Sequence, residues 1–176
     1  IVTDVSNGTT SLSGSTVTYT PTANYNGTDS FTFKANDGTV DTAANGTISI
    51  TIAAVNDAPT TSDGTVTVTS ETETTLDLST VASDIDGDNL TYTIVSNPSN
   101  GTLSGASGSD INYTSDEGYV GSDTFTFKVN DGSADSNTST VTITVNAPNF
   151  YYDFNGTDER IKFDVDWTSF EGYTTN

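Results

Sequence analysis

Cysteine, methionine and histidine are all absent from this chain of 176 residues. Their absence excludes disulfide bonds, thiol nucleophiles, zinc sites built from cysteine or histidine, and every catalytic triad or dyad that uses imidazole as its base. Secreted domains are commonly held together by disulfides, so a secreted chain without them must be held by its core alone or by bound ions.

Basic side chains are scarce as well, with 4 Lys and Arg against 24 Asp and Glu, which gives a formal net charge of −20. A chain with so little positive charge offers nothing to neutralise nucleic-acid phosphates or anionic lipid headgroups. No run approaches the ~18 consecutive apolar residues of a membrane-spanning helix. We therefore expect no nucleic-acid partner and no membrane insertion of this segment.

A segment of roughly ninety residues is repeated in tandem. Residues 29–41 return with few changes at 123–135, and Phe31 and Phe125 are 94 positions apart. This period is too long for a helical or leucine-rich solenoid unit, and it is close to the ~100 residues of a β-sandwich domain. Because Ile1 aligns with Ile94, well inside the second repeat, we interpret the chain as a fragment of a longer protein.

Apolar and polar residues alternate with the period of a β-strand, and turn-forming residues separate the alternating segments. No window of ten residues has helical periodicity. The second repeat is expected to contain seven strands, at residues 65–69, 75–78, 91–95, 101–103, 110–113, 123–130 and 138–145. This pattern predicts an all-β chain of tandem immunoglobulin-like Greek-key β-sandwiches. The inward-facing aromatic residues are expected to form the cores: Tyr19, Phe31, Phe33, Tyr92, Tyr113, Phe125 and Phe127.

The repeat boundaries predict four segments. Residues 1–53 would be the C-terminal part of a repeat whose first two strands are missing, and residues 54–60 a linker. Residues 61–146 would be a complete repeat. Residues 147–176 do not match the start of either repeat, so we expect them to open a different β domain.

Three carboxylates occupy alternate positions around a glycine at Asp84, Asp86 and Asp88. Such a group is costly to hold together unless a cation neutralises it, and hard oxygen ligands favour Ca²⁺. The spacing resembles half of an EF-hand loop. However, position 12 of such a loop would be Val95 instead of the required Glu, which excludes an EF-hand.

The predicted topology brings further acidic residues to the same pole of the sandwich. The loop with Asp131 and Asp135 between the last two strands and the segment with Asp57 before the first strand converge there. The alternative is ordinary Asp-Gly turn chemistry on a solvated surface. We predict a calcium site at the junction of the two repeats, with these ligands: Asp57, Asp84, Asp86, Asp88, Asp131 and Asp135.

Four motifs follow one another in order, at Val55–Pro59, Asp84–Tyr92, Gly101–Gly105 and Asp123–Gly132. Together they resemble the cadherin-like tandem repeats of very large bacterial surface proteins, over residues 1–148. The resemblance implies an extracellular, calcium-stiffened stalk. Residues 152–163 are similar to the opening strands of laminin G-like, concanavalin-type jelly rolls, although a third, divergent sandwich is the alternative.

Two functions fit these features. The first is a structural or adhesive stalk on a bacterial surface, which presents a terminal binding domain to partners such as surface glycans. The alternative is a spacer and carbohydrate-binding region of a secreted polysaccharide-degrading enzyme. The chain itself is not expected to be an enzyme, because its acidic residues lie on turns at the sandwich poles and are not paired in a cleft.

Overall fold

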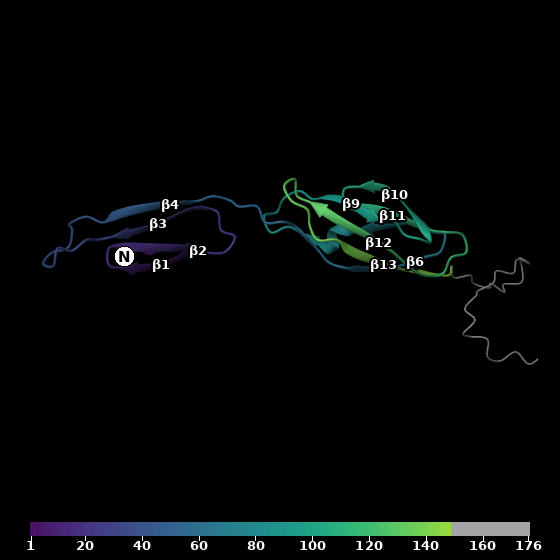
Figure 1. Cartoon of the computed structure of the whole chain (residues 1–176), viewed down its shortest axis with the longest axis horizontal. Coiled ribbons are helices and arrows are strands. Elements are labelled where there is room, and N and C mark those ends of the chain that lie inside the picture. Colours follow the sequence, from purple (N-terminus) through teal and green to yellow (C-terminus); the bar gives the residue numbers. More distant parts are fainter. Residues whose placement is uncertain (149–176) are drawn as a thin grey trace, which may run out of the picture. The chain divides into compact units, whose positions relative to one another are not determined.

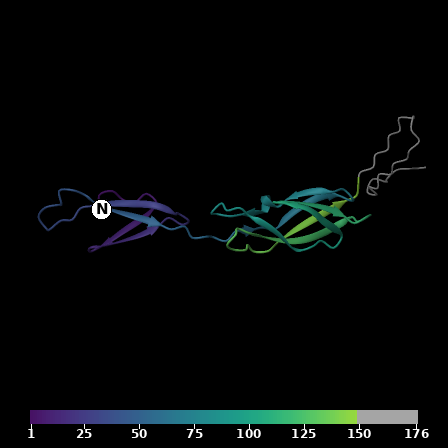
Figure 2. The same cartoon turned by 90° about the horizontal axis from the view of Figure 1, so that it is seen from above.

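The computed structural model describes residues 1–148, which divide into two compact units, the first Ile1–Asp57 and the second beginning at Ala58 (Figure 1, Figure 2). The different β domain predicted for residues 147–176 lies, apart from its first two residues, outside the described part of the chain.

The second unit is a sandwich of two sheets. The first sheet has the order β10 (Gly101–Ser107), β11 (Asp110–Ser115) and β7 (Thr74–Asp77). The second sheet has the order β6 (Gly64–Thr69), β13 (Ser139–Asn146), β12 (Gly121–Asn130) and β9 (Thr91–Ser96). All pairings in these sheets are antiparallel except that of β6 with β13, which is parallel. Because strands distant in sequence are neighbours in both sheets, the predicted all-β, immunoglobulin-like sandwich is confirmed.

The alternating pattern places its apolar positions between the two sheets of the second unit. Phe125, Phe127 and Ile143 are completely buried, as is Tyr113 on the opposite sheet. Tyr92 is only partly buried and packs against the edge of this cluster. The expected core of the second repeat is thus found, with Tyr92 at its margin.

Three short elements of the second unit have no counterpart among the predicted strands. β5 (Thr60–Thr61) pairs with β8 (Ala82–Ser83), and the single 3₁₀ turn η1 (Leu78–Val81) lies just before β8. The turn begins where the Asp77 side chain accepts a hydrogen bond from the backbone amide of Ser79, and it buries Leu78. These elements lead the chain into the loop that contains Asp84.

The first unit consists of two antiparallel hairpins. One joins β1 (Gly8–Ser13) to β2 (Thr16–Pro21), and the other joins β3 (Gly27–Phe33) to β4 (Gly46–Ile52). Thr3 forms an isolated bridge with Thr32, at the position that β9 takes beside β12 in the second unit. The repeat offset therefore matches β1 to β4 with β10 to β13. Within residues 1–148, no helix has the length and apolar character required to cross a membrane.

Candidate metal-binding loop

Residues 84–88 form a tight loop between β8 and β9, and one side chain organises it. Oδ1 of Asp84 accepts hydrogen bonds from the backbone amides of Asp86, at 2.9 Å, and Asp88, at 3.1 Å. Gly87 has a φ of +80°, a left-handed conformation that glycine adopts without steric cost. The sequence Asp-x-Asp-Gly-Asp therefore bends the backbone around the first carboxylate.

The bend gathers three carboxylates. Asp84, Asp86 and Asp88 each offer one oxygen atom, and these atoms all lie within 4.8 Å of one another. Asp86 and Asp88 are exposed, whereas Asp84 is partly buried. The second oxygen of Asp84, Oδ2, is buried and has no hydrogen-bond partner among the described residues. A group of like charges with an unsatisfied buried acceptor is chemically suited to a hard cation, which would supply both charge and coordination.

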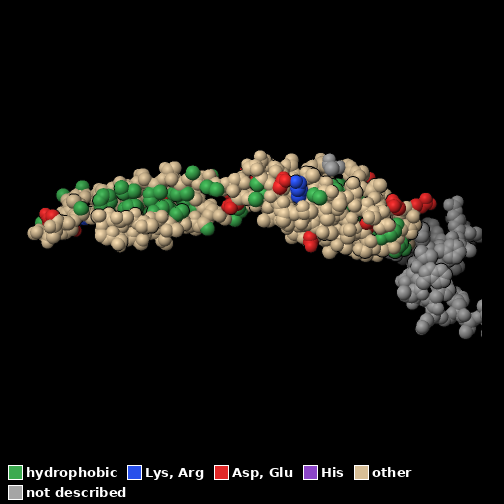
Figure 3. Space-filling view, viewed as in Figure 1, with side chains coloured by type: hydrophobic (Ala, Val, Ile, Leu, Met, Phe, Trp, Pro, Cys, Tyr) green, Lys and Arg blue, Asp and Glu red, His purple; other side chains and the backbone are tan. Residues whose placement is uncertain are grey.

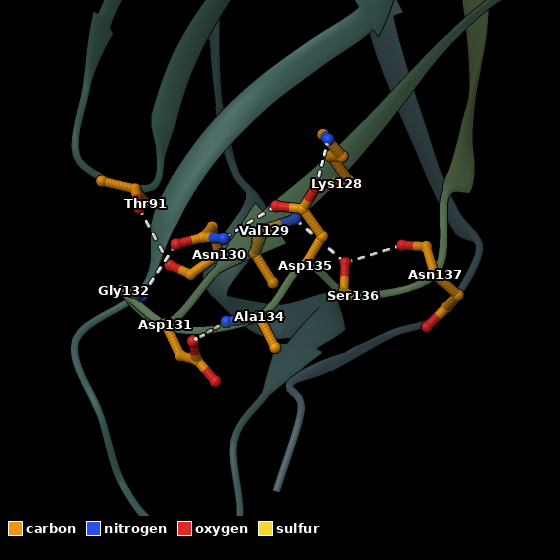
Figure 4. A network of polar contacts seen from close by, with 10 residues as sticks. All are labelled: Thr91, Lys128, Val129, Asn130, Asp131, Gly132, Ala134, Asp135, Ser136 and Asn137. Carbon is orange, nitrogen blue, oxygen red and sulfur yellow. Dashed lines mark hydrogen bonds and ion pairs between the residues drawn. The ribbon is translucent and has the colours of Figure 1, made fainter. Parts of the chain in front are cut away.

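The loop between β12 and β13 is built differently, around Asn130 and Asp131 (Figure 4). Oδ1 of Asp131 accepts hydrogen bonds from the amides of Ser133 and Ala134, at 2.6 and 2.7 Å. The side chain of Asn130 accepts another from the amide of Gly132, at 2.7 Å. These bonds hold the Asn-Asp-Gly sequence in a turn from within.

The first unit repeats this turn with the same chemistry. Asp37 accepts hydrogen bonds from the amides of Thr39 and Val40, and Asn36 accepts one from Gly38. Since both repeats use the motif to shape a loop, turn formation accounts for its recurrence.

Asp135 faces the β12 strand. Its carboxylate forms a salt bridge with Lys128, at 2.5 Å, and accepts a hydrogen bond from the side-chain amide Nδ2 of Asn130, at 2.8 Å. The hydrogen bonds from Lys128 and Asn130 lower the pKa of Asp135 below its usual value. Figure 4 shows the carboxylates of Asp131 and Asp135 pointing away from each other.

The six predicted metal ligands thus fall into three groups. The loop brings Asp84, Asp86 and Asp88 together. Asp131 and Asp135 are not members of this cluster within the described residues, and each holds its own loop contacts. Asp57 is the last residue of the first unit. A ligand role for each of the six residues stays a prediction.

One polar site was missed by reasoning from the sequence. Asp123 is buried at the start of β12, where it accepts hydrogen bonds from three backbone amides and one hydroxyl. The donors lie at 2.9–3.0 Å and are Ser99, Asn100, Thr124 and Tyr113. Asp29 of the first unit accepts from the matching set, namely Ser6, Asn7, Ser30 and Tyr19. The signal in the sequence is that Asp29 and Tyr19 recur as Asp123 and Tyr113 at the same offset of 94 residues, which indicates that the two side chains belong to one site.

The ionisation of this buried pair follows from its contacts. Burial alone raises the pKa of Asp123, but the hydrogen bonds from Ser99, Asn100, Thr124 and Tyr113 favour the charged carboxylate, and the net effect is a pKa below the usual value. Burial, together with the hydrogen bond to Asp123, raises the pKa of Tyr113. The site is therefore a neutral phenol hydrogen-bonded to an ionised carboxylate. It holds residues 99 and 100 and β11 against β12, and it offers no reactive group.

A sequence profile described as a bacterial Ig domain matches residues 1–51 and again residues 56–144. No curated protein matches the chain.

Among solved structures, human mucin-like protocadherin EC1-2 is similar, with 17% sequence identity, a TM-score of 0.51, and coverage of 82% of this chain and 84% of that chain. This likeness confirms the cadherin-like, immunoglobulin-like architecture that the motifs predicted. The endo-fucoidan hydrolase MfFcnA4 from glycoside hydrolase family 107 is matched at 25% identity and a TM-score of 0.40, over 84% of this chain. The chain spans only 24% of the length of that hydrolase.

Proposed function

The chain belongs to the bacterial Ig domain family, and from this premise we propose that it is a non-catalytic, calcium-binding repeat segment of an extracellular protein. In this proposal the complete repeat, residues 61–146, binds calcium through the loop of Asp84, Asp86 and Asp88. Neighbouring modules of the same longer chain are its partners, and its role is to space or present a binding domain.

The observation that carries the proposal is the geometry of the loop at residues 84–88. Three carboxylate oxygens lie within 4.8 Å of one another, and the buried Oδ2 of Asp84 has no hydrogen-bond partner among the described residues. Like charges at this separation repel one another, and burying an unsatisfied acceptor adds a further cost. Calcium accepts six to eight oxygen ligands in flexible geometry, so water or further side chains can complete its coordination.

If the loop binds calcium, the second unit should be more stable in calcium than in chelator. A ligand that binds only the folded state stabilises it by mass action, so saturating Ca²⁺ should raise the melting temperature of the second unit by about 5–15 °C. Differential scanning calorimetry in calcium and in chelator measures this shift. Mg²⁺ at the same concentration should give a smaller shift, because it requires near-ideal octahedral geometry.

Substitutions that remove a charge from the loop distinguish calcium binding at residues 84–88 from a general effect of salt on stability. Asp88→Asn should stabilise the calcium-free protein, because it relieves repulsion, and it should reduce the response to calcium. Asp116→Asn is the matched control, since Asp116 is exposed and lies outside the acidic cluster. A melting temperature that is unchanged by calcium, or a response that survives Asp84→Asn with Asp88→Asn, would contradict the proposal.

The same repeat could serve in two settings, which stay predictions. One is a stalk on a bacterial surface, and the other is a spacer beside a polysaccharide-degrading domain. The domains that flank this segment in the full-length protein distinguish the two settings: many further copies of the repeat favour the stalk, and an adjoining catalytic domain favours the spacer.

A further inference from the structure

Three Asp-Gly pairs occur in the second unit, at Asp63, Asp86 and Asp131. An aspartate that precedes glycine can react with its own backbone, because glycine has no Cβ atom to keep its amide nitrogen away from the aspartate carboxyl carbon. The three pairs share this chemistry but differ in their surroundings. Their contacts therefore indicate which of them can react.

Hydrogen bonds restrain two of the pairs. The amide of Gly132, which would have to attack Asp131, donates instead to the side chain of Asn130 at 2.7 Å. The Asp131 carboxylate is itself held by two further amides of the turn. The Asp63 carboxylate accepts a hydrogen bond from the amide of Thr140 on the neighbouring strand, at 2.8 Å. Reaction at either pair requires these bonds to break first.

The third pair, Asp86–Gly87, has no such restraint on its glycine. Within residues 1–148 the backbone amide of Gly87 donates no hydrogen bond, although the amides on either side of it both donate to Asp84. The surroundings of Gly87 are open, since a Cβ atom added there would have no neighbour within 4 Å. Asp86 is exposed, and Figure 3 shows acidic side chains of the second unit at its surface, where water reaches them. Nucleophile, carboxyl group and water are thus all available at this pair.

We propose that Asp86–Gly87 is a site of spontaneous isoaspartate formation and that calcium bound by the loop suppresses it. In the first step the Gly87 nitrogen bonds to Cγ of Asp86, and the amide hydrogen, a solvent proton and one carboxylate oxygen leave as water. Water then opens the resulting succinimide ring at the former backbone carbonyl of Asp86, so the chain continues through the side chain. Water is lost in one step and regained in the other, so the mass is unchanged and no other reactant is needed.

The effect of calcium rests on the calcium binding proposed above. A carboxylate oxygen of Asp86 that coordinates the ion cannot leave as water, so only the calcium-free fraction reacts. With calcium at about 100 times its dissociation constant this fraction is about one in a hundred, and the reaction should slow by the same factor. Isoaspartate lengthens the backbone by one atom and moves the carboxylate away from Asp84 and Asp88. A loop left without calcium therefore loses its site irreversibly.

The test ages the intact chain for several weeks in near-neutral buffer, with excess calcium or with chelator, and maps isoaspartate by electron-transfer fragmentation of its peptides. In chelator, Asp86 should accumulate at least about tenfold more isoaspartate than Asp63 or Asp131, because the need to break a hydrogen bond of ordinary strength reduces a reactive population roughly tenfold. Calcium should slow the change at Asp86 far more than at the other two. Asn-Gly pairs are distinguished because deamidation changes the mass, whereas isomerisation does not.

A matched pair of variants tests the protecting hydrogen bond. Asn130→Ala frees the amide of Gly132 and should raise isoaspartate at Asp131 by about tenfold. Ser133→Ala changes the same turn but keeps that bond, and it should have no effect. The rate at Asp63 reports on unfolding and should be unchanged in both variants. Unchanged isoaspartate at Asp131 in Asn130→Ala would overturn the assignment, because the bond to Gly132 would then not explain the difference between the pairs.

The melting temperature of the fresh protein separates this inference from the proposed function. If calcium raises the melting temperature, but isoaspartate in chelator is spread evenly over the three pairs, the inference is wrong and the calcium site stands. The same holds if isoaspartate forms at Asp86 equally fast with and without calcium. If calcium changes neither the melting temperature nor the rate at Asp86, the calcium site is absent and its protective effect is overturned with it.

Discussion

At the scale of single residues, both repeats rely on one buried carboxylate at the start of a long strand. The carboxylate of Asp123 accepts hydrogen bonds from three backbone amides and from the hydroxyl of Tyr113. These bonds connect residues 99 and 100 and strand β11 to strand β12. Hydrogen bonds to a charged acceptor are worth roughly 1.5–3 kcal/mol, more than those between neutral groups. This contact joins the two sheets at a point where no disulfide is available.

Asp123→Asn should therefore destabilise the second unit. The substitution places an NH₂ group where four donors converge, so at least one buried donor loses its acceptor, and the cost should be about 1.5–3 kcal/mol. Urea denaturation followed by circular dichroism measures the change. Asp116→Asn is the matched control at an exposed position and should have little effect. Equal midpoints for the two variants would show that the network does not stabilise the fold.

The same residue predicts the response to acid. The pKa of Asp123 is lower in the folded protein than in the unfolded chain, so its contribution to stability is present above the unfolded value of about 3.9 and is lost as pH falls through the lower, folded value. The free energy of unfolding of the second unit should decrease below about pH 4. In Asp123→Asn this decrease should be smaller, although part should remain because the pKa values of Asp77 and Asp135 are also lowered. Urea midpoints between about pH 2 and 7 test this, and parallel curves for the two proteins would contradict it.

The acidic loop could be predicted from the sequence, but the buried carboxylate could not. Asp84, Asp86 and Asp88 stand close together in sequence around a glycine, so local spacing alone indicates that they share a loop. The partners of Asp123 come from three separate segments, and only the folded sheets bring them together. The predicted convergence of Asp131 and Asp135 also depended on side-chain directions, which the sequence does not specify.

At the scale of strands, period-two alternation predicted the second repeat well. Each of its seven expected strands overlaps one of the strands β6, β7 and β9 to β13, with ends that differ by a few residues. The short elements β5, η1 and β8 were not predicted, because two-residue pairings carry no periodic signal. The parallel pairing of β6 with β13 likewise depends on tertiary packing.

Glycine at the start of β10 is required by the close approach of β11. A Cβ atom at Gly101 would lie 2.6 Å from both the carbonyl oxygen of Thr114 and an aromatic carbon of Tyr113. Gly8 of the first unit is in the same position against Thr20 and Tyr19. The recurrence of this glycine therefore reflects a backbone contact beside the core tyrosine.

Gly101→Ala should destabilise the second unit by about 1–3 kcal/mol, because the added methyl group must displace backbone. Gly64→Ala is the matched control at the start of β6, where the nearest atom, on Val81, would lie at an ordinary contact distance of 3.4 Å. That change should be neutral or slightly stabilising, since alanine restricts the unfolded chain. Urea midpoints of the two variants provide the comparison, and similar losses for both would show that the contact with Thr114 is not the cause.

At the scale of the whole molecule, the two units bury very different cores. The second unit contains a cluster of eleven buried hydrophobic residues, whereas Phe31 is the one hydrophobic residue of comparable burial among residues 1–57. Buried apolar area is the main favourable term in folding, at about 25 cal/mol per Å². The first unit, with two separate hairpins and an exposed apolar face, should therefore be much the less stable of the two.

We accordingly expect two transitions when the chain is unfolded by urea. Residues 1–57 should lose their amide protection first, at low urea, because few buried contacts oppose the conformational entropy of the unfolded hairpins. Residues 60–146 should unfold later in one cooperative step. Hydrogen exchange at increasing urea, resolved by segment, measures both midpoints within one sample. A single transition shared by both segments would show that the exposed face of the first unit does not limit its stability.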